Sequence, residues 1–213
     1  MIDLTDRSQW LVGRSKGIGG SDAGAIIGVN RFKTNVQLWE EKMGNVKPAD
    51  LSDNPYVRYG TLAEPSIRNL FALDYPEYTV EYHENRLLRS TIKPFMQASL
   101  DGELIDQNGR RGILEIKTSN MMSASAWSNW EDRIPDSYYA QILHYLIVTG
   151  YGFAVLRAHL VYSKDRDVRT TVRHYFIERS DVIEDMDYLA EKEQEFWDGL
   201  QKGIRPNLIL PAL

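Results

Sequence analysis

Two carboxylates and one amine lie at positions in this sequence where β-strand geometry could bring them together. Asp101 belongs to the β-prone stretch MQASLDGELI, and Glu115 and Lys117 belong to the stretch GILEIKT. Side chains alternate between the two faces of a strand, so Glu115 and Lys117 point to one side, whereas Leu114 and Ile116 point to the other. A strand whose composition is typical of a protein interior therefore carries a charge pair on one face.

The turn between these two strands decides whether Asp101 joins the pair. The intervening DQNGR is typical of a β-hairpin, and a two-residue Asn-Gly loop would place Asp101 opposite Ile116, on the wrong face. A three-residue loop ending in a left-handed Gly109, with a G1 bulge, places Asp101 opposite Glu115 instead. Two carboxylates would then lie about 5 Å apart at their β-carbons and repel each other. A divalent cation between them explains this arrangement best, so we predict the three-residue loop.

The chemistry expected of such a group is metal-dependent hydrolysis. Carboxylate oxygens are the ligands that Mg²⁺ or Mn²⁺ prefers, and the main-chain carbonyl of Ile116 could reach the same ion. A bound ion can activate water, and Lys117 can orient that water and offset developing negative charge. From these residues alone, a surface salt bridge between Glu115 and Lys117 is an equally good explanation.

Composition sets limits on the remaining possibilities. The chain has 213 residues, of which 43% are hydrophobic and 26% are charged, so we expect one globular domain over residues 1–213. The absence of cysteine excludes disulfides, iron–sulfur clusters and cysteine-based zinc sites. No apolar run approaches the ~20 residues that span a bilayer, and the N-terminal stretch lacks the pattern of a signal peptide. We therefore expect a cytoplasmic protein with no membrane contact.

The net charge of −5 argues mildly against nucleic-acid binding, but the charge is unevenly distributed. Residues 181–198 are strongly acidic, and basic residues gather elsewhere. A positive groove on an acidic body is therefore compatible with the composition. The basic residues that could line it are Arg7, Arg14, Lys16, Arg31, Lys33, Arg110 and Arg111.

The elements that must position the carboxylates follow from periodicity and turn residues. Helices are expected over 21–27 after a Ser21-Asp22 cap, over 34–43 after a Thr34 cap, over about 56–73, over 136–149 after an Asp136 cap, and over 181–200. Strands are expected over 78–89, 94–105, 112–118, 153–162 and 170–177. Pro65 suggests that the third helix begins or bends near Thr61. The glycine-rich region before Ser21 is expected to be a loop, and Trp127 and Trp130 to lie in a partly exposed segment.

Five separated motifs occur in an order that resembles one protein family. The motifs are RSKGIGGSDAGAIIG, YGTLAEPSI, ASLDGEL, GILEIKTS and YYAQILHYL, spread over about residues 10–160. Together they resemble the YqaJ-like viral recombinases, phage-type relatives of the lambda-type alkaline exonucleases in the PD-(D/E)XK nuclease superfamily. Leu100 stands where the superfamily motif has proline. The resemblance implies a restriction-endonuclease-like α/β core, a mixed β-sheet flanked by helices.

The resemblance also assigns roles to individual residues. It implies that Asp101, Glu115 and Lys117 form the catalytic core and that Glu64 completes the metal site. In isolation, Glu64 fits a capping box with Thr61 better.

The same resemblance implies a DNA-end site. Arg14 and Ser21 match a pair that holds a terminal 5′-phosphate, Gln141 matches a glutamine of the later helix, and Arg31 is a further DNA contact. Ser21 could instead be only a helix cap, which is compatible with a phosphate site. Gln141 and Tyr145, one helical turn apart, could be a core-facing pair.

The implied activity is that of a Mg²⁺-dependent 5′→3′ exonuclease, with Mn²⁺ as a substitute, that digests one strand of linear double-stranded DNA. Such enzymes are often homotrimers and work with a single-strand annealing protein in phage recombination. Two alternatives remain open: a restriction-type or structure-specific endonuclease of the same fold, and a non-catalytic DNA-end-binding protein.

Overall fold

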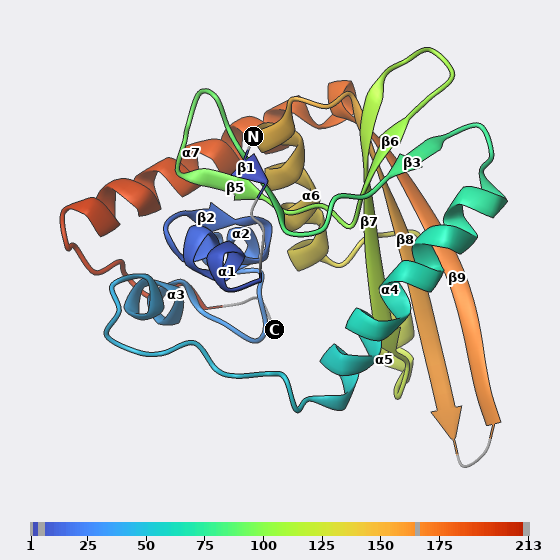
Figure 1. Cartoon of the computed structure of the whole chain (residues 1–213). Helices are drawn as coiled ribbons and strands as arrows, with labels where there is room; N and C mark the ends of the chain where they lie inside the picture. The colour runs from blue at the N-terminus through green and yellow to red at the C-terminus, as the bar shows by residue number, and fades with distance from the viewer. Residues whose placement is uncertain (1, 4–6, 165–166, 211–213) are drawn as a thin grey trace.

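The computed structural model describes residues 2–3, 7–164 and 167–210, which form two β-sheets with helices packed around them (Figure 1). The larger sheet has the strand order β3-β6-β7-β8-β9. Its strands are β3 (Thr79–Glu81), β6 (Gly102–Ile105), β7 (Arg111–Asn120), β8 (Phe153–Lys164) and β9 (Asp167–Glu178). Strands β7 and β8 are parallel and the other neighbours are antiparallel, so the sheet is mixed, as expected.

The hairpin between β6 and β7 has the predicted three-residue loop. Gly102 pairs with Leu114 and Ile105 pairs with Arg111, the register that places residue 101 opposite residue 115. The Gly109 backbone N–H donates to the Asp106 carbonyl at 2.9 Å, and Gly109 has a φ of +76°, a conformation that glycine adopts without steric cost. The register on which the site depends is therefore confirmed.

Two helices cover opposite faces of β7. Helix α4 (Pro55–Asp74) packs Ile67 and Phe71 against Leu114 and Ile116. Helix α6 (Asp136–Thr149) lies on the other side, within the cluster that contains Ile113. Glu115 and Lys117 share the α6 face because they alternate with the residues beneath α4.

Helix α4 spans the residues predicted for it, and Pro65 lies inside it. It begins at Pro55 after an Asn54 cap, whose side chain accepts from the Tyr56 backbone N–H at 2.9 Å, and it runs past Pro65. Thr61 lies within the helix and donates its hydroxyl to the Val57 carbonyl at 3.1 Å. The predicted span of about 56–73 is therefore confirmed, and a start at Thr61 is excluded, because the Asn54-Pro55 pair already supplies a strong helix start.

The two long strands predicted over 78–89 and 94–105 are each divided between sheets. Strands β3 and β6 belong to the larger sheet, and a smaller sheet has the order β1-β4-β5-β2. Its strands are β1 (Ile2–Asp3), β4 (Arg86–Arg89), β5 (Met96–Ala98) and β2 (Ile18–Gly19). Asn85, with a φ of +57°, turns the chain between β3 and β4, and a bend at Asp101 separates β5 from β6.

The remaining helices are α1 (Arg7–Ser15), α2 (Gly20–Ile26), α3 (Asn35–Lys42), α5 (Ala124–Ser128) and α7 (Ile183–Gln201), with a 3₁₀ turn at Arg179–Val182. Helices α1, α2, α3 and α7 lie on the side of α6 and the smaller sheet, whereas α5 lies near the lower end of β7 (Figure 1). Helix α1 was not predicted. The Thr34 cap of α3 is confirmed, and left-handed Gly150 ends α6 as predicted.

Two predicted caps are wrong. The N-cap of α6 is Pro135, with Asp136 in the first turn, and the N-cap of α2 is Gly19 rather than Ser21. Across the described ranges, no helix combines the length and the apolar character that crossing a membrane requires.

Candidate active site

The charge pair on β7 is buried. Lys117 Nζ lies 2.6 Å from Glu115 Oε1, and Glu115 is only 1% exposed. Its second oxygen, Oε2, is buried without a hydrogen-bond partner. A surface salt bridge therefore does not describe this pair, since an unsatisfied buried carboxylate oxygen costs free energy that a surface pair would not.

Asp101 lies at the bend that precedes β6 and faces the same site. Its Oδ2 accepts from the Ile116 backbone N–H at 2.8 Å, and its main-chain carbonyl accepts from Arg68 Nε. Hydrogen bonds to the side chain and to the main-chain carbonyl therefore hold Asp101 beside β7. The metal-ligand role of the Ile116 carbonyl stays a prediction.

Glu64 reaches the site from α4. Its Oε1 is 2.5 Å from Nη2 of Arg68, one helical turn further on. The capping-box alternative is excluded, because α4 begins well before this turn. Arg68 was not singled out from the sequence, although its spacing of four residues from Glu64 on a helix is a recognisable signal. It is buried and joins Glu64 to the backbone of Asp101.

The three carboxylates share one electrostatic environment. Burial and the charge of Asp101 raise the pKa of Glu115 to about 8, and the same two causes raise the pKa of Glu64 to about 7. Burial also raises the pKa of Asp101, although Lys117 and the Ile116 N–H oppose this. Burial lowers the pKa of Lys117, but the charges of Glu115 and Asp101 outweigh it and keep the ammonium protonated.

The donor set suits a hard divalent cation, although the described residues include no ready-made cluster of three or more metal-ligating side chains. The fit rests on the unpartnered Glu115 Oε2 and on carboxylates close enough to raise one another's pKa. A bound cation would give Glu115 Oε2 a partner and would lower the raised pKa values, since it favours the charged form of each carboxylate. Glu64 would have to exchange its contact with Arg68 for the ion.

Gln141 on α6 orients the Glu115 carboxylate. Its Nε2 donates to Glu115 Oε1 at 2.7 Å and to the Tyr145 hydroxyl at 3.0 Å. Tyr145 is buried, so this pair both packs in the core and contacts the site. A Cβ on Gly20 would lie 2.5 Å from the Tyr145 ring, so only glycine allows α2 to approach α6 this closely.

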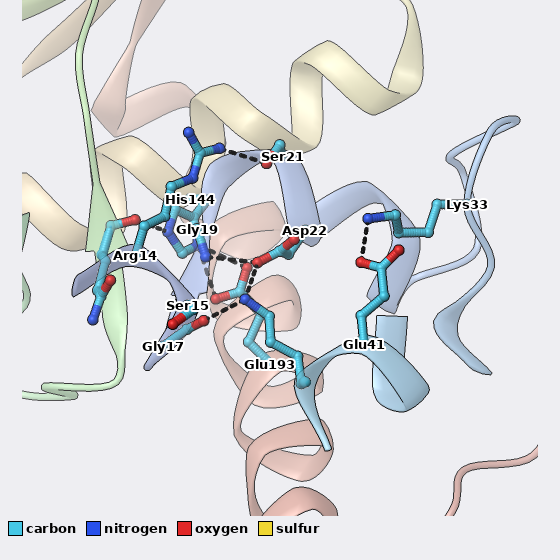
Figure 2. A network of polar contacts seen from close by, with 12 residues as sticks. Arg14, Ser15, Gly17, Gly19, Ser21, Asp22, Lys33, Glu41, His144 and Glu193 are labelled. Atoms are coloured by element: carbon cyan, nitrogen blue, oxygen red, sulfur yellow. Dashed lines mark hydrogen bonds and ion pairs between the residues drawn. The ribbon is translucent and has the colours of Figure 1, made fainter. Parts of the chain in front are cut away.

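Arg14 and Ser21 lie together at the start of α2. Arg14 Nη2 donates to Ser21 Oγ at 2.8 Å, and Figure 2 shows the guanidinium directed at the hydroxyl. Burial raises the pKa of Asp101, and the charge of Arg14 is among those that oppose this. The pair therefore lies within electrostatic reach of the carboxylates.

A half-buried ion pair holds the backbone that joins Arg14 to Ser21, and the sequence did not point to it. Lys42 Nζ, from α3, lies 2.8 Å from Asp22 Oδ2 and donates to the Gly17 carbonyl at 2.6 Å. Asp22 Oδ2 in turn accepts from the Gly19 backbone N–H at 3.1 Å (Figure 2). Burial opposes ionisation of Asp22, but Lys42 and the Gly19 N–H keep its pKa below the ordinary value.

Arg31 lies apart from these residues, at a pocket formed by the segment after α2, the end of β7 and the segment before α6. It is exposed and has no hydrogen bond or ion pair with another residue of the described ranges. Several other basic residues predicted for a groove are neutralised: Lys33 by Glu41, Arg110 by Asp106 and Glu178, and Arg111 by Glu103. The side chain of Arg7 lies outside the described part of the chain.

Trp130 has a packing role. It is 2% exposed and its ring lies 5.5 Å from that of Tyr138. The partly exposed position expected for Trp130 is therefore wrong, and its ring is not available for base stacking.

Solved structures share this fold at low sequence identity. An alkaline exonuclease (LHK-Exo) from Laribacter hongkongensis matches with a TM-score of 0.67 and 17% identity, over 92% of this chain and 93% of that chain. A phage related exonuclease from Haemophilus somnus 129PT matches with a TM-score of 0.59 and 13% identity, over 88% of this chain and 96% of that one. The expected fold class, an α/β PD-(D/E)XK core, is confirmed.

Sequence comparison gives the family. The uncharacterized protein YqaJ of Bacillus subtilis (strain 168) is 32% identical over 203 residues, 95% of this chain, which spans 59% of that relative's length. The model of the "YqaJ-like viral recombinase domain" matches residues 9–152, more than half of the sequence. The chain therefore belongs to the YqaJ-like viral recombinase family.

Proposed function

We propose that this chain is a Mg²⁺-dependent 5′→3′ exonuclease that digests one strand of linear double-stranded DNA and leaves 3′ single-stranded overhangs. The observation that carries the proposal is the group formed by half-buried Glu64, half-buried Asp101 and buried Glu115 beside Lys117, in which the charge of Asp101 raises the pKa of both glutamates. Membership of a viral recombinase family and the fold of two exonucleases support it.

Glu64, Asp101 and Glu115 would hold the ion, together with the main-chain carbonyl of Ile116. A bound Mg²⁺, or Mn²⁺ in its place, supplies Lewis acidity that activates water and stabilises charge on the scissile phosphate. Gln141 holds Glu115 in position through its hydrogen bond to Oε1.

Lys117 contributes charge at the reacting phosphate. Its ammonium stays protonated, so it can orient the attacking water and offset the negative charge that develops. It lies on the same face of β7 as Glu115, within 2.6 Å of that carboxylate. The alternation of side chains along β7 therefore places Lys117 beside Glu115.

Arg14 and Ser21 would bind the terminal 5′-phosphate. A guanidinium and a hydroxyl 2.8 Å apart can together bind phosphate oxygens. Anchoring the end of the strand near the carboxylates favours end-dependent, stepwise digestion over internal cleavage. Arg31 would contact the DNA backbone further along.

The wider setting follows from the family resemblance. We propose that residues 1–213 form one nuclease domain that works as a cytoplasmic homotrimer, encoded by a phage or prophage. Its partner would be a single-strand annealing protein that receives the 3′ overhang.

The test compares four DNA substrates with the purified chain in Mg²⁺: linear duplex with a 5′-phosphate, linear duplex with a 5′-hydroxyl, closed circular duplex, and single strands. We expect nucleotide release from the phosphorylated linear duplex, none from the circle, and none in EDTA. Glu115→Gln should abolish release and retain binding.

Other outcomes support the alternatives. Cleavage of the closed circle would indicate an endonuclease of the same fold. Binding of DNA ends by the wild-type chain, with no metal-dependent cleavage, would indicate a non-catalytic end-binding protein. Either result overturns the exonuclease proposal.

A further inference from the structure

A pocket of about 170 Å³ lies beside the catalytic group. Tyr138 joins the two places, because it lines the pocket and its ring centroid lies 5.1 Å from Lys117 Nζ. Ser119, another lining residue, is two positions beyond Lys117 on β7 and so on the same face, about 7 Å along the strand. The pocket therefore lies beside Lys117, further along β7.

The mouth of this pocket carries an aromatic ring that packs on little of the protein. Phe32 is 95% exposed, more than any other large apolar side chain of the described residues. The neighbouring Arg31 is exposed and has no polar partner among those residues. A free aromatic face beside an unpaired guanidinium is the combination with which proteins bind unpaired nucleotides.

The other aromatic residues of the pocket are less available than Phe32. Trp130 packs against Tyr138 and is closed to solvent, and Tyr138 is only partly exposed. Phe32 is therefore the most exposed ring of the pocket. The second guanidinium of the pocket, Arg133, is bound to Asp136 at 2.7 Å.

We propose that this pocket is a nucleotide subsite, in which Phe32 stacks on a nucleobase of the strand being cut while Arg31 contacts the adjoining phosphate. The proposal rests on the proposed function, since it assigns a nucleotide of the same DNA strand to a space beside Lys117. The pocket has room for one unpaired base and not for a base pair, so the strand must be separated before its base enters. Stacking is tolerant of sequence, which suits an enzyme that digests any sequence.

The test uses duplexes with 2-aminopurine at single positions near the phosphorylated 5′ end, bound to the full chain carrying Glu115→Gln so that the DNA stays intact. Removal of the probe base from the DNA stack raises its fluorescence. We expect a fluorescence increase at one position, loss of that increase in the Phe32→Ala variant, and its retention in Phe32→Tyr. In the cleaving enzyme, Phe32→Ala should raise KM about tenfold with a smaller effect on kcat.

Ile92→Ala is the matched control, because Ile92 is also exposed (88%) and does not line the pocket. It should leave both fluorescence and KM unchanged. If Phe32→Ala behaves like this control while DNA is still bound and cut, the subsite is wrong and the proposed function stands. If the chain neither binds nor cuts DNA, both fail together. If Phe32→Ala instead weakens binding of another protein, while DNA binding, cleavage and probe fluorescence are unchanged, the nucleotide subsite is also wrong.

Discussion

Glu115 combines burial with an incomplete set of hydrogen bonds. Gln141 and Lys117 occupy one of its oxygens, and the other has no partner. A purely structural position would favour a neutral or fully bonded side chain, since a buried charge costs free energy. The carboxylate is therefore best explained by a ligand that needs it.

The burial of the Glu115 carboxylate predicts how the free energy of unfolding depends on pH in the absence of metal. Glu115 has a pKa of about 8 in the folded chain against an ordinary value near 4.5, so the folded state binds more protons in between. The free energy of unfolding in EDTA should therefore be highest below pH 4.5 for this group and fall as the pH rises through about 8. The loss should be on the order of a few kcal/mol. Urea unfolding at pH 5.5 and 8.5 measures it.

The matched comparison is Glu115→Gln, which cannot titrate. Its free energy of unfolding should fall less over the same interval. Equal pH dependence in the two proteins would show that Glu115 does not carry the raised pKa.

At the level of secondary structure, the geometry of Arg14 and Ser21 depends on a residue of a third helix. Lys42 lies on α3, yet its bonds to Asp22 and to the Gly17 carbonyl fix the loop between Arg14 and Ser21. It acts as a positioning residue for that pair.

Lys42→Met should therefore lower the preference for 5′-phosphorylated over 5′-hydroxyl ends about tenfold, because the Arg14–Ser21 geometry loosens. Lys42→Arg should restore most of it. Glu40, on the same helix, pairs at the surface with Arg205, so Glu40→Gln is the control and should leave the ratio unaltered. A Lys42→Met enzyme with the full preference would show that the ion pair serves stability alone.

Helices α6 and α7 are joined by a second buried ion pair. His144 Nδ1 lies 2.9 Å from Glu193, and its Nε2 lies 2.8 Å from the Gln97 carbonyl of β5. Both ring nitrogens face acceptors, so the ring is an imidazolium. Burial lowers its pKa, but Glu193 outweighs this and raises it.

Glu193→Gln should cost roughly 3–5 kcal/mol of unfolding free energy, because it leaves a buried charge unpaired. The double variant His144→Leu with Glu193→Leu should recover much of that loss. Urea unfolding near pH 6 gives both values.

The stabilisation by His144 is complete below the pKa that the residue has in the unfolded chain, and it should diminish as the pH rises through the pKa in the folded chain. A single variant as stable as the wild type would contradict this account of the α6–α7 contact.

The elements nearest the site could be predicted because their signals are local. The three-residue loop before Arg110, the alternation around Glu115 and the Gly150 stop each follow from backbone rules. Helix α1 could not be predicted, because its glycine-rich surroundings resemble a loop. The division of 78–89 and 94–105 between two sheets depends on tertiary packing.

The residues that the structure brings together could be predicted, but the residues that support them could not. Lys42 and Asp22 act through a contact between two helices, and their spacing reveals no role by itself. Only the Glu64 to Arg68 spacing carried a local signal.

At the scale of the molecule, an acidic chain can bind DNA if its unpaired cations gather on one face. Arg31 has no partner in the described ranges, whereas Arg110 is held by Asp106 and Glu178. Each phosphate contact releases condensed counterions, so it steepens the salt dependence of binding.

Arg31→Gln should therefore weaken DNA binding and reduce the slope of log K against log salt by about one. Arg110→Gln removes the same formal charge and should leave the slope unchanged. Fluorescence anisotropy over a salt series measures both. Equal slopes in Arg31→Gln and the wild type would remove Arg31 from the DNA-contacting residues.

The proposed function requires Glu64, Asp101 and Glu115 to converge on one divalent cation. Crystals of the chain soaked in Mn²⁺, with anomalous diffraction data, test this most directly. We predict one or more anomalous peaks among these three carboxylates beside Lys117, and their absence in crystals of Glu115→Gln. An empty carboxylate group, with Glu64 still bound to Arg68 at saturating Mn²⁺, would contradict the account.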